Sequence, residues 1–187
     1  MPVVGATVGP VDELTRLLGE AQAGDSRSLE AFVRLTQPSV WRFCAHLLGP
    51  DDATDATQET YLAAWRAMPA FRGDASARTW LFAIARRTAE RVARGRRRWV
   101  ELADHALGPP PSAHPEQAAE LGDLLAGLDL DRRLALVLTQ IVGLSYAEAA
   151  AVCDCPVGTI RSRVARGRKD LIERLEARPE ASGLGDT

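Results

Sequence analysis

Apolar residues recur at intervals of three and four positions along most of the chain, a spacing that places them on one face of an α-helix. Turn-forming residues interrupt the pattern, which therefore predicts separate helices. We expect them at residues 11–22, 26–48, 51–68, 77–96, 146–153 and 157–175, with two more between 116 and 143. Pro38 should kink or break the second helix. Aromatic residues make up 5% of the sequence, which favours alanine- and leucine-rich helices over a β-sandwich, so the predicted fold class is all-α.

The stretch from Leu144 to Lys169 predicts a helix, a tight turn and a second helix. Asp154 falls at the turn and tolerates a left-handed conformation, and Pro156 suits the first helical position. The apolar face of the second helix should pack into the core through Val157, Ile160, Val164, Leu171 and Leu175. Its other face carries small and basic residues and no acid, as major-groove readout requires. The alternative is a solvated basic helix.

The predicted helix at 51–68 has two unlike faces. One is a polar, acidic stripe with a single leucine, made of Asp55, Gln58, Glu59 and Leu62. The other should belong to the core and carries Tyr61, Ala64, Trp65 and Met68. A stripe of the first kind is usually a solvated surface. Its acids make a basic protein a possible partner.

A loop at 71–77 follows, with Gly73 available for a turn and Ser76 placed to cap the next helix. That helix should bury Trp80, Leu81, Ile84, Thr88 and Val92. Arginines emerge on its opposite side and at its end. An aromatic loop beside a basic helix is typical of a groove for single-stranded nucleic acid. A membrane-surface helix is the alternative, but the apolar face is rich in alanine rather than bulky residues.

The formal net charge of the 187 residues is −2, so the overall composition does not indicate nucleic acid. The distribution does, because basic clusters and acidic clusters occupy different segments. A Gly/Pro-rich stretch separates the two helical parts. We expect domains at 11–99 and 116–178, a flexible linker at 100–115 and a disordered tail at 179–187.

The sequence contains few candidates for catalytic residues. The three cysteines cannot form a closed disulfide framework, and the C-x-C pair Cys153 and Cys155 has no second ligand pair nearby. Walker loops, zincin helices and nucleophile elbows are not present. The sequence shows neither a secretory signal nor an apolar run of membrane-spanning length. We expect a cytoplasmic protein with no catalytic residues, metal site or cofactor, and no insertion into a membrane.

Three motifs in combination resemble the extracytoplasmic-function (ECF) group of bacterial sigma-70 factors. They read D-x-x-Q-E-x-x-L-x-x-W from Asp55, F-R-G-x-x-x-x-x-T-W-L from Phe71 and C-P-V-G-T-I-R-S-R from Cys155. The likeness covers about residues 11–175 and is greatest to actinobacterial sigma-C-type members. It implies a subunit that binds core RNA polymerase and directs promoter-specific transcription. Residues 11–99 would be region 2 and residues 116–178 region 4.

The resemblance also implies roles for particular residues. The β′ clamp helices of the polymerase would bind Asp55, Gln58, Glu59 and Leu62. The melted −10 element would contact Phe71, Arg72, Gly73, Asp74, Arg78, Trp80, Arg86 and Arg87, although Trp80 is also a core candidate. Arg87 stands where some members carry asparagine, which leaves the preferred −10 base open. Region 4 would bind the β flap and read the −35 element through Arg161, Ser162, Ala165 and Arg166, flanked by phosphate contacts from Arg163, Arg168 and Lys169. An anti-sigma factor is a further possible partner.

Two other functions fit parts of the sequence. A stand-alone helix-turn-helix regulator would share the C-terminal motif, but the loop and basic helix at 71–96 have no evident role there. An enzyme would need the C-x-C pair as a metal or redox site, for which the sequence supplies no further ligands.

Overall fold

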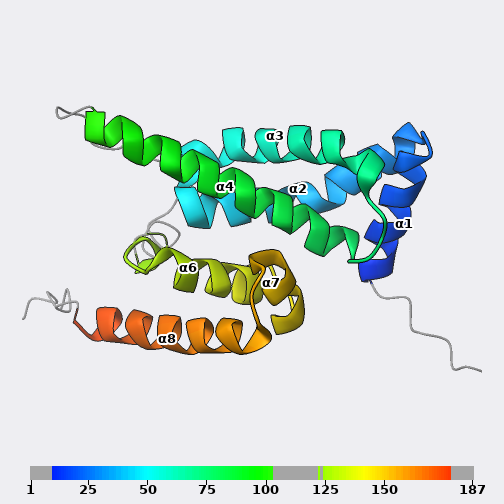
Figure 1. Cartoon of the computed structure of the whole chain (residues 1–187). Helices are drawn as coiled ribbons and strands as arrows, with labels where there is room; N and C mark the ends of the chain where they lie inside the picture. Colours follow the sequence, from blue (N-terminus) through cyan, green and yellow to red (C-terminus); the bar gives the residue numbers. More distant parts are fainter. Residues whose placement is uncertain (1–9, 103–121, 123, 178–187) are drawn as a thin grey trace, which may run out of the picture.

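The structure of this chain, a computed structural model, describes residues 10–102, 122 and 124–177, with backbone alone at 10–12 and 96–102. The described residues are helical apart from short connections and contain no strand, which confirms the all-α prediction. Figure 1 shows the first four helices in one layer above the rest of the chain. The elements are α1 (Pro10–Gln22), α2 (Ser26–Leu48), α3 (Pro50–Ala67), η1 (Met68–Ala70), α4 (Ala77–Leu102), α6 (Leu130–Leu136), η2 (Val137–Ile141), α7 (Tyr146–Cys153) and α8 (Val157–Glu176).

Most of the predicted helix ends are close to the observed ones. Asp25 caps α2 by accepting a hydrogen bond from the Arg27 N–H, and Ser76 caps α4 by accepting one from the Thr79 N–H. However, α4 runs to Leu102, beyond the predicted end at 96 and into the predicted linker. Most of that linker and the predicted tail at 179–187 lie outside the described residues.

The N-terminal helices share an apolar core. Phe43 of α2 and Phe82 of α4 meet edge to face, with ring centroids 5.4 Å apart, and both side chains are fully buried. Thr57 and Thr60 of α3 are also buried, and each hydroxyl donates to a backbone carbonyl four residues earlier. These two buried hydroxyls are therefore satisfied within α3, so α3 can pack closely against α2 and α4.

The expected break at Pro38 does not occur, because α2 is a single helix from Ser26 to Leu48. Proline removes one backbone hydrogen bond, but Pro38 is exposed, so its ring faces solvent. The neighbouring Thr36 and Val40 are buried, and the Thr36 hydroxyl lies 2.7 Å from the Tyr61 hydroxyl of α3. Packing on both sides of the proline therefore outweighs the lost bond.

The C-terminal helices form a second unit around α8. Asp129 caps α6 at the point where the sequence predicted a break between two helices. The chain then continues without interruption into a π-helical turn, η2. Ile160 and Val164 of α8 are buried, and Gly167 is buried where α8 meets α6. A Cβ atom at Gly167 would lie 2.8 Å from Leu136 Cδ1, so these two helices approach more closely than a side chain would permit.

The two units pack directly against each other. Figure 1 shows α6 and α7 beneath α2 and α4, with α8 on the far side. Two arginines join the units by donating to carbonyls near the ends of helical segments. Arg78 of α4 donates to the Val142 carbonyl after η2, and Arg133 Nη1 of α6 donates to the Leu47 carbonyl of α2 at 3.2 Å. The sequence predicted two domains joined by a linker but not this contact.

Two expected core residues are instead exposed. Trp65 of α3 is 57% exposed and Leu175 of α8 is 51% exposed. Each lies at helical spacing from buried neighbours, but no other helix covers its part of the surface. Trp80, a candidate both for the core and for DNA contact, is partly buried and packs against the core.

We predict that replacing Gly167 with valine lowers the free energy of unfolding by about 1–3 kcal/mol, because the added atoms overpack the contact with Leu136. Gly158→Val is the matched control in the same helix, since a Cβ atom there meets nothing within 4 Å. Urea unfolding of both variants measures the difference. Equal stability of the two variants would show that the contact between α6 and α8 is loose.

Candidate nucleic-acid interface

Local interactions define both helices of the predicted helix-turn-helix. The Ser145 side chain accepts a hydrogen bond from the Glu148 N–H at 3.2 Å, and the Glu148 carboxylate accepts one from the Ser145 N–H at 2.8 Å. This capping box starts α7, and its S-x-x-E pattern is visible in the sequence. Asp154 adopts the predicted left-handed conformation, with φ at 51°. Pro156 is the N-cap residue of α8, one position before the predicted place.

The outer face of α8 is open to solvent. Its exposed members are Arg161, Ser162, Ala165 and Arg166. Within the described chain, neither Arg161 nor Arg166 has a hydrogen-bond or ion-pair partner. The Ser162 hydroxyl donates to the Thr159 carbonyl at 2.9 Å, so it can only accept from an outside group. Two free guanidinium groups and one acceptor therefore project from this face.

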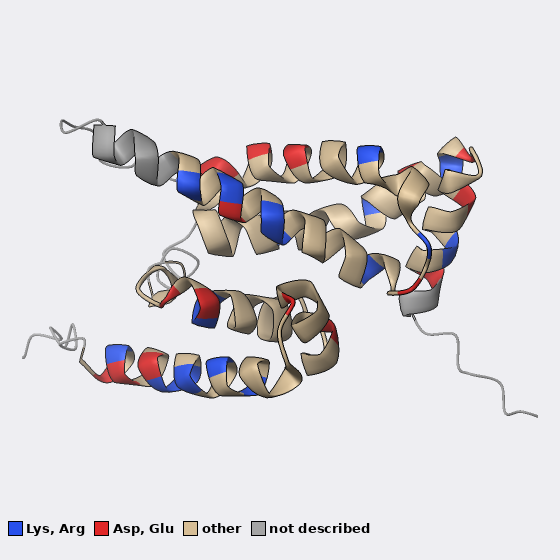
Figure 2. Ribbon diagram, viewed as in Figure 1, with Lys and Arg blue, Asp and Glu red and all other residues tan. Residues whose placement is uncertain are grey.

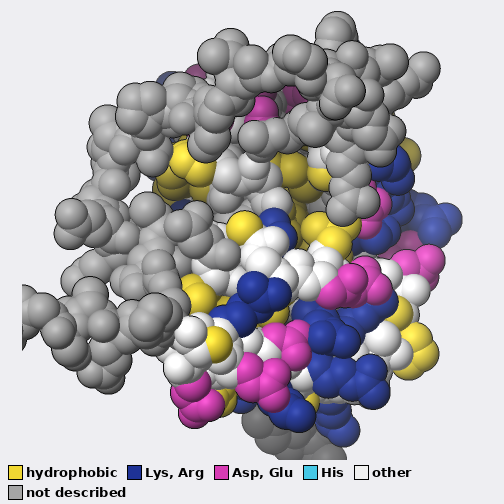
Figure 3. Space-filling view, turned by 90° about the vertical axis from the view of Figure 1, so that its left-hand side faces the viewer, with side chains coloured by type: hydrophobic (Ala, Val, Ile, Leu, Met, Phe, Trp, Pro, Cys, Tyr) yellow, Lys and Arg dark blue, Asp and Glu magenta, His cyan; other side chains and the backbone are white. Residues whose placement is uncertain are grey.

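The basic residues at the flanks of this face are already engaged. Arg163 donates to the Asp131 carboxylate of α6, and its Nη1 lies 3.8 Å from Cys155 Sγ. Arg168 donates to the Gln140 side chain at 2.7 Å. Lys169 lies 3.5 Å from Glu173. Figure 3 shows basic and acidic side chains interspersed on the end of the molecule where α8 finishes. The bonds of Arg163 and Arg168 tie α8 to α6 and η2, whereas the Lys169–Glu173 pair lies within α8.

The predicted acidic stripe lies on the outer side of α3. Asp55, Gln58 and Leu62 are exposed, and Glu59 is half-buried because it pairs with Arg91 of α4. Trp65 continues the same helix as a second exposed apolar side chain. Figure 2 shows acids concentrated on α3 and basic residues along α4. This surface thus combines carboxylates with exposed apolar groups, as a basic, partly apolar helix of another protein would require.

The loop before α4 is held at its base. Gln22 Nε2 donates to the Pro69 and Phe71 carbonyls at 3.1 and 3.0 Å. The Phe71 ring packs against Trp80, with centroids 5.3 Å apart and planes tilted by 58°. The tip of the loop is exposed and consists of Arg72, Gly73 and Asp74, with the arginine and the aspartate 2.9 Å apart. The Phe71–Trp80 pair therefore has a fixed position at the start of α4.

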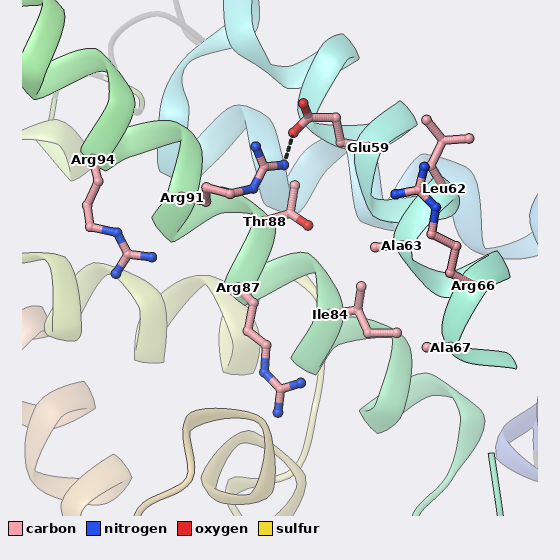
Figure 4. A pocket seen from close by; sticks show the side chains of 10 residues that line it. All are labelled: Glu59, Leu62, Ala63, Arg66, Ala67, Ile84, Arg87, Thr88, Arg91 and Arg94. Atoms are coloured by element: carbon pink, nitrogen blue, oxygen red, sulfur yellow. Dashed lines mark hydrogen bonds and ion pairs between the residues drawn. The ribbon is translucent and has the colours of Figure 1, made fainter. Parts of the chain in front are cut away.

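A groove of about 710 Å³ lies between α3 and α4. Figure 4 shows four arginines around it, two of them from the second half of α4. The lining consists of Glu59, Leu62, Ala63, Arg66, Ala67, Ile84, Arg87, Thr88, Arg91 and Arg94. Only Glu59, Leu62 and Arg87 of these were proposed as site residues from the sequence. The others were visible there as basic or small residues at helical spacing, but their position opposite α3 required the tertiary structure.

Comparison with known families identifies the chain. Residues 32–99 match the family described as sigma-70 region 2, and residues 118–171 match sigma-70, region 4. The ECF RNA polymerase sigma factor SigC of Mycobacterium tuberculosis is 46% identical over 183 residues, covering 91% of this chain and 96% of the relative. The chain belongs to the sigma-70 family. It is an ECF-group sigma factor similar to SigC, as its motifs had suggested, and directs promoter-specific transcription by RNA polymerase.

Two solved structures resemble most of the fold. CnrH, solved in complex with the cytosolic domain of CnrY, is 28% identical with a TM-score of 0.75 and covers 90% of this chain and 100% of its own. RpoE of Bartonella quintana, solved with the anti-sigma factor NepR, is 31% identical with a TM-score of 0.72 and covers 82% of this chain and 99% of its own.

Regions 2 and 4 of this sigma factor enclose two arginines that were predicted to contact −10 DNA. Arg78 is bonded to the Val142 carbonyl. Arg86 bonds Glu90 at 2.7 Å and lies close enough to Cys153 for its charge to lower that pKa. Both side chains therefore face region 4 in this arrangement, whereas Arg87 on the next position is exposed in the groove.

Burial disfavours the thiolate form of two cysteines, because it raises the pKa of Cys44 as well as that of Cys153. Burial raises the pKa of Cys153 to about 11, despite the opposing influence of Arg86. A thiol with so high a pKa is protonated at neutral pH and is a poor nucleophile or metal ligand. In the described part of the chain, no three His, Cys, Asp or Glu side chains gather as a metal site would require. None of the described helices has the length and hydropathy needed to cross a membrane.

We predict that Arg163→Ala and Arg166→Ala differ in their effect on stability. Removing Arg163 breaks its ion pair with Asp131 and should lower the free energy of unfolding by about 0.5–1 kcal/mol. Arg166 makes no such contact, so its replacement should leave stability unchanged or slightly raise it. Thermal unfolding at low salt measures both. A larger loss for Arg166→Ala would contradict the assignment of Arg163 to the framework of region 4.

Proposed function

We propose that this sigma factor divides its work among three surfaces. The outer face of α8 reads the −35 element, the groove and loop beside α4 hold the melted −10 strand, and the outer face of α3 binds core polymerase. The observation that carries this assignment is the separation of free from engaged arginines. Arg161 and Arg166 on α8, and Arg87 in the groove, have no partner within the described chain.

The −35 assignment is supported by the geometry of α8. The helix follows a tight turn, as in helix-turn-helix proteins whose second helix enters the major groove. Arginine can bind guanine through two hydrogen bonds, and only a guanidinium free of internal partners can do so without breaking another contact. Arg168 and Lys169 lie on the same helix but have partners in region 4. We therefore assign them, with Arg163, to orienting the helix and to contacts with DNA phosphates.

The polymerase assignment is supported by the mixed character of α3. We propose that the β′ clamp helices contact the stripe of Asp55, Gln58, Glu59 and Leu62, and that Trp65 extends it as an apolar anchor. Aromatic residues are enriched at the centres of protein interfaces. The β flap would bind region 4, as the family likeness implies.

The −10 assignment requires the two regions to separate in part. Arg87 lines the groove, and Phe71 packs on Trp80, which lies four residues before the groove residue Ile84 on α4. Arg72, Gly73 and Asp74 form the exposed loop tip. Arg78 and Arg86 face region 4, so they can reach DNA only after α7 and η2 move away. We therefore propose that closed packing of the regions excludes strand contacts by Arg78 and Arg86, while the groove lined by Arg87 stays accessible.

Other features of the proposal follow from the family. The factor acts in the cytoplasm, carries no catalytic residues or cofactor of its own, and relies on the polymerase for chemistry. Because RpoE was solved with an anti-sigma factor, such a factor is a further proposed partner for this chain. A stand-alone helix-turn-helix regulator is the alternative, and it would leave the exposed face of α3 without a role.

We predict that the α3 surface is essential for core binding. Asp55→Ala with Glu59→Ala removes two charges, each worth about 1.5–3 kcal/mol if it forms a charge-assisted contact. Trp65→Ala should weaken binding further without unfolding the protein, because its side chain is 57% exposed. Fluorescence titration of core polymerase measures affinity. Leu35→Ala on α2, also exposed, is the control for loss of an apolar surface residue. Unchanged affinity of the double variant would refute the assignment.

The decisive experiment for the function is transcription by core polymerase from a library with a randomised −35 element. Arg161→Ala and Arg166→Ala should each flatten preference at particular base pairs, a loss of about 1–3 kcal/mol of discrimination per pair. Arg168→Ala should reduce output evenly across sequences. Even loss of output for Arg161→Ala and Arg166→Ala would show that α8 anchors DNA without reading it. Specific binding of library DNA without core polymerase would favour the stand-alone regulator.

A further inference from the structure

Glu59 lies at the edge shared by two of the proposed surfaces. It belongs to the acidic stripe on the outer face of α3, and it also lines the groove between α3 and α4. In the groove its carboxylate accepts a hydrogen bond from Arg91 of α4 (Figure 4). This ion pair is therefore placed where a basic side chain of the polymerase would compete for Glu59 and a nucleic-acid phosphate would compete for Arg91.

The charges around the groove are unbalanced. Its ten lining residues include four arginines and Glu59 as the single acid. Arg66, Arg87 and Arg94 have no ion-pair partner in the part of the chain that the structure describes. Glu59 thus neutralises one of the four positive charges that a phosphate backbone would meet. Removing the carboxylate from the groove would strengthen its attraction for an anion.

The Glu59–Arg91 ion pair is suited to exchange. The side chains of Arg91 and Glu59 are 62% and 41% exposed, and exposed pairs contribute only about 0–1 kcal/mol. Little free energy is lost if another cation takes the carboxylate. Arg87, Arg91 and Arg94 follow at i, i+4 and i+7 along α4, so a released Arg91 would complete a row of cations whose first two members rise about 6 Å apart.

We propose that the Glu59–Arg91 ion pair is an exchangeable gate between polymerase docking and strand binding. A basic side chain of the docked polymerase takes Glu59, and Arg91 is released to bind a DNA phosphate. By linkage, strand binding by Arg91 strengthens docking at Glu59 to the same degree. This inference rests on the proposed function of both surfaces and adds a coupling between them. Arg91 was not among the residues predicted to bind the −10 element.

The test uses the full chain, without polymerase, and a fluorescein-labelled dT12 oligonucleotide titrated between 50 and 200 mM salt. Each phosphate contact adds about 0.7 to the slope of log affinity against log salt for single strands. Glu59→Gln should steepen the slope by about 0.7, which is about a 2.5-fold greater loss of affinity across that range. Arg91→Ala alone should leave the slope unchanged. Arg91→Ala in the Glu59→Gln background should restore the wild-type slope.

Two matched variants separate the gate from general electrostatics. Asp55→Asn removes the same charge one turn away on α3, outside the groove, and should not change the slope. Arg94→Ala removes a groove arginine without a described partner and should reduce the slope by about 0.7 in the wild-type background. The gate is refuted if Asp55→Asn and Glu59→Gln act alike, or if Arg91→Ala has the same effect in both backgrounds.

A second arm uses the holoenzyme, where polymerase should already hold Glu59. At saturating core polymerase, Arg91→Ala should reduce permanganate reactivity of thymines in the promoter bubble, although it leaves dT12 binding by the free chain unchanged. Equal reactivity of the two holoenzymes would overturn the proposal. If Arg94→Ala leaves dT12 binding unaltered, the strand groove itself is wrong. If Glu59→Gln keeps wild-type affinity for core polymerase, the docking surface is wrong, and in either case the gate falls with it.

Discussion

The packing of α4 against four other helices is the constraint on which every proposed surface depends. It contacts α1, α2, α3 and α7. Small buried residues such as Ala77, Ala85 and Ala89 allow these close approaches. The arginines of α4 whose side chains the structure describes therefore emerge at two places. Arg78 and Arg86 meet region 4, while Arg87, Arg91 and Arg94 line the groove with α3.

Arginine serves two purposes in this protein, and the contacts of each guanidinium distinguish them. Arg132, Arg133 and Arg163 bind carboxylates or carbonyls of other helices and hold region 4 together or against region 2. Arg161 and Arg166 project without a partner among the described residues. A charged group already hydrogen-bonded in the folded state gains less from an outside partner than a free one does, because the old bond must be broken first. Basic composition alone would not separate the two groups.

The contact between regions 2 and 4 gives the family function a conformational requirement. The regions meet through an alanine-rich helix, α7, and around a π-helical turn, η2, after which the Val142 carbonyl accepts a bond from Arg78. Such an interface can open at modest cost, since interfaces between domains of one chain resemble transient ones. Binding partners that act on the separated regions therefore compete with this packing, and only differential affinity for the open form can shift it.

Local chemistry was readable from the sequence alone. The helix positions, the left-handed turn at Asp154, the cap at Ser76 and the all-α fold follow from spacing and from residues whose preferences act within a few positions. Two side chains required the tertiary structure. Trp65 has the spacing of a core residue, but none of the described helices covers it, and Arg163 has the sequence of a DNA contact but pairs with Asp131 on α6. Periodicity states which face of a helix is apolar, whereas the neighbouring helices decide how much of that face is buried. The groove at Glu59 and Arg91 exists only because α3 and α4 are brought together from 32 positions apart in the chain.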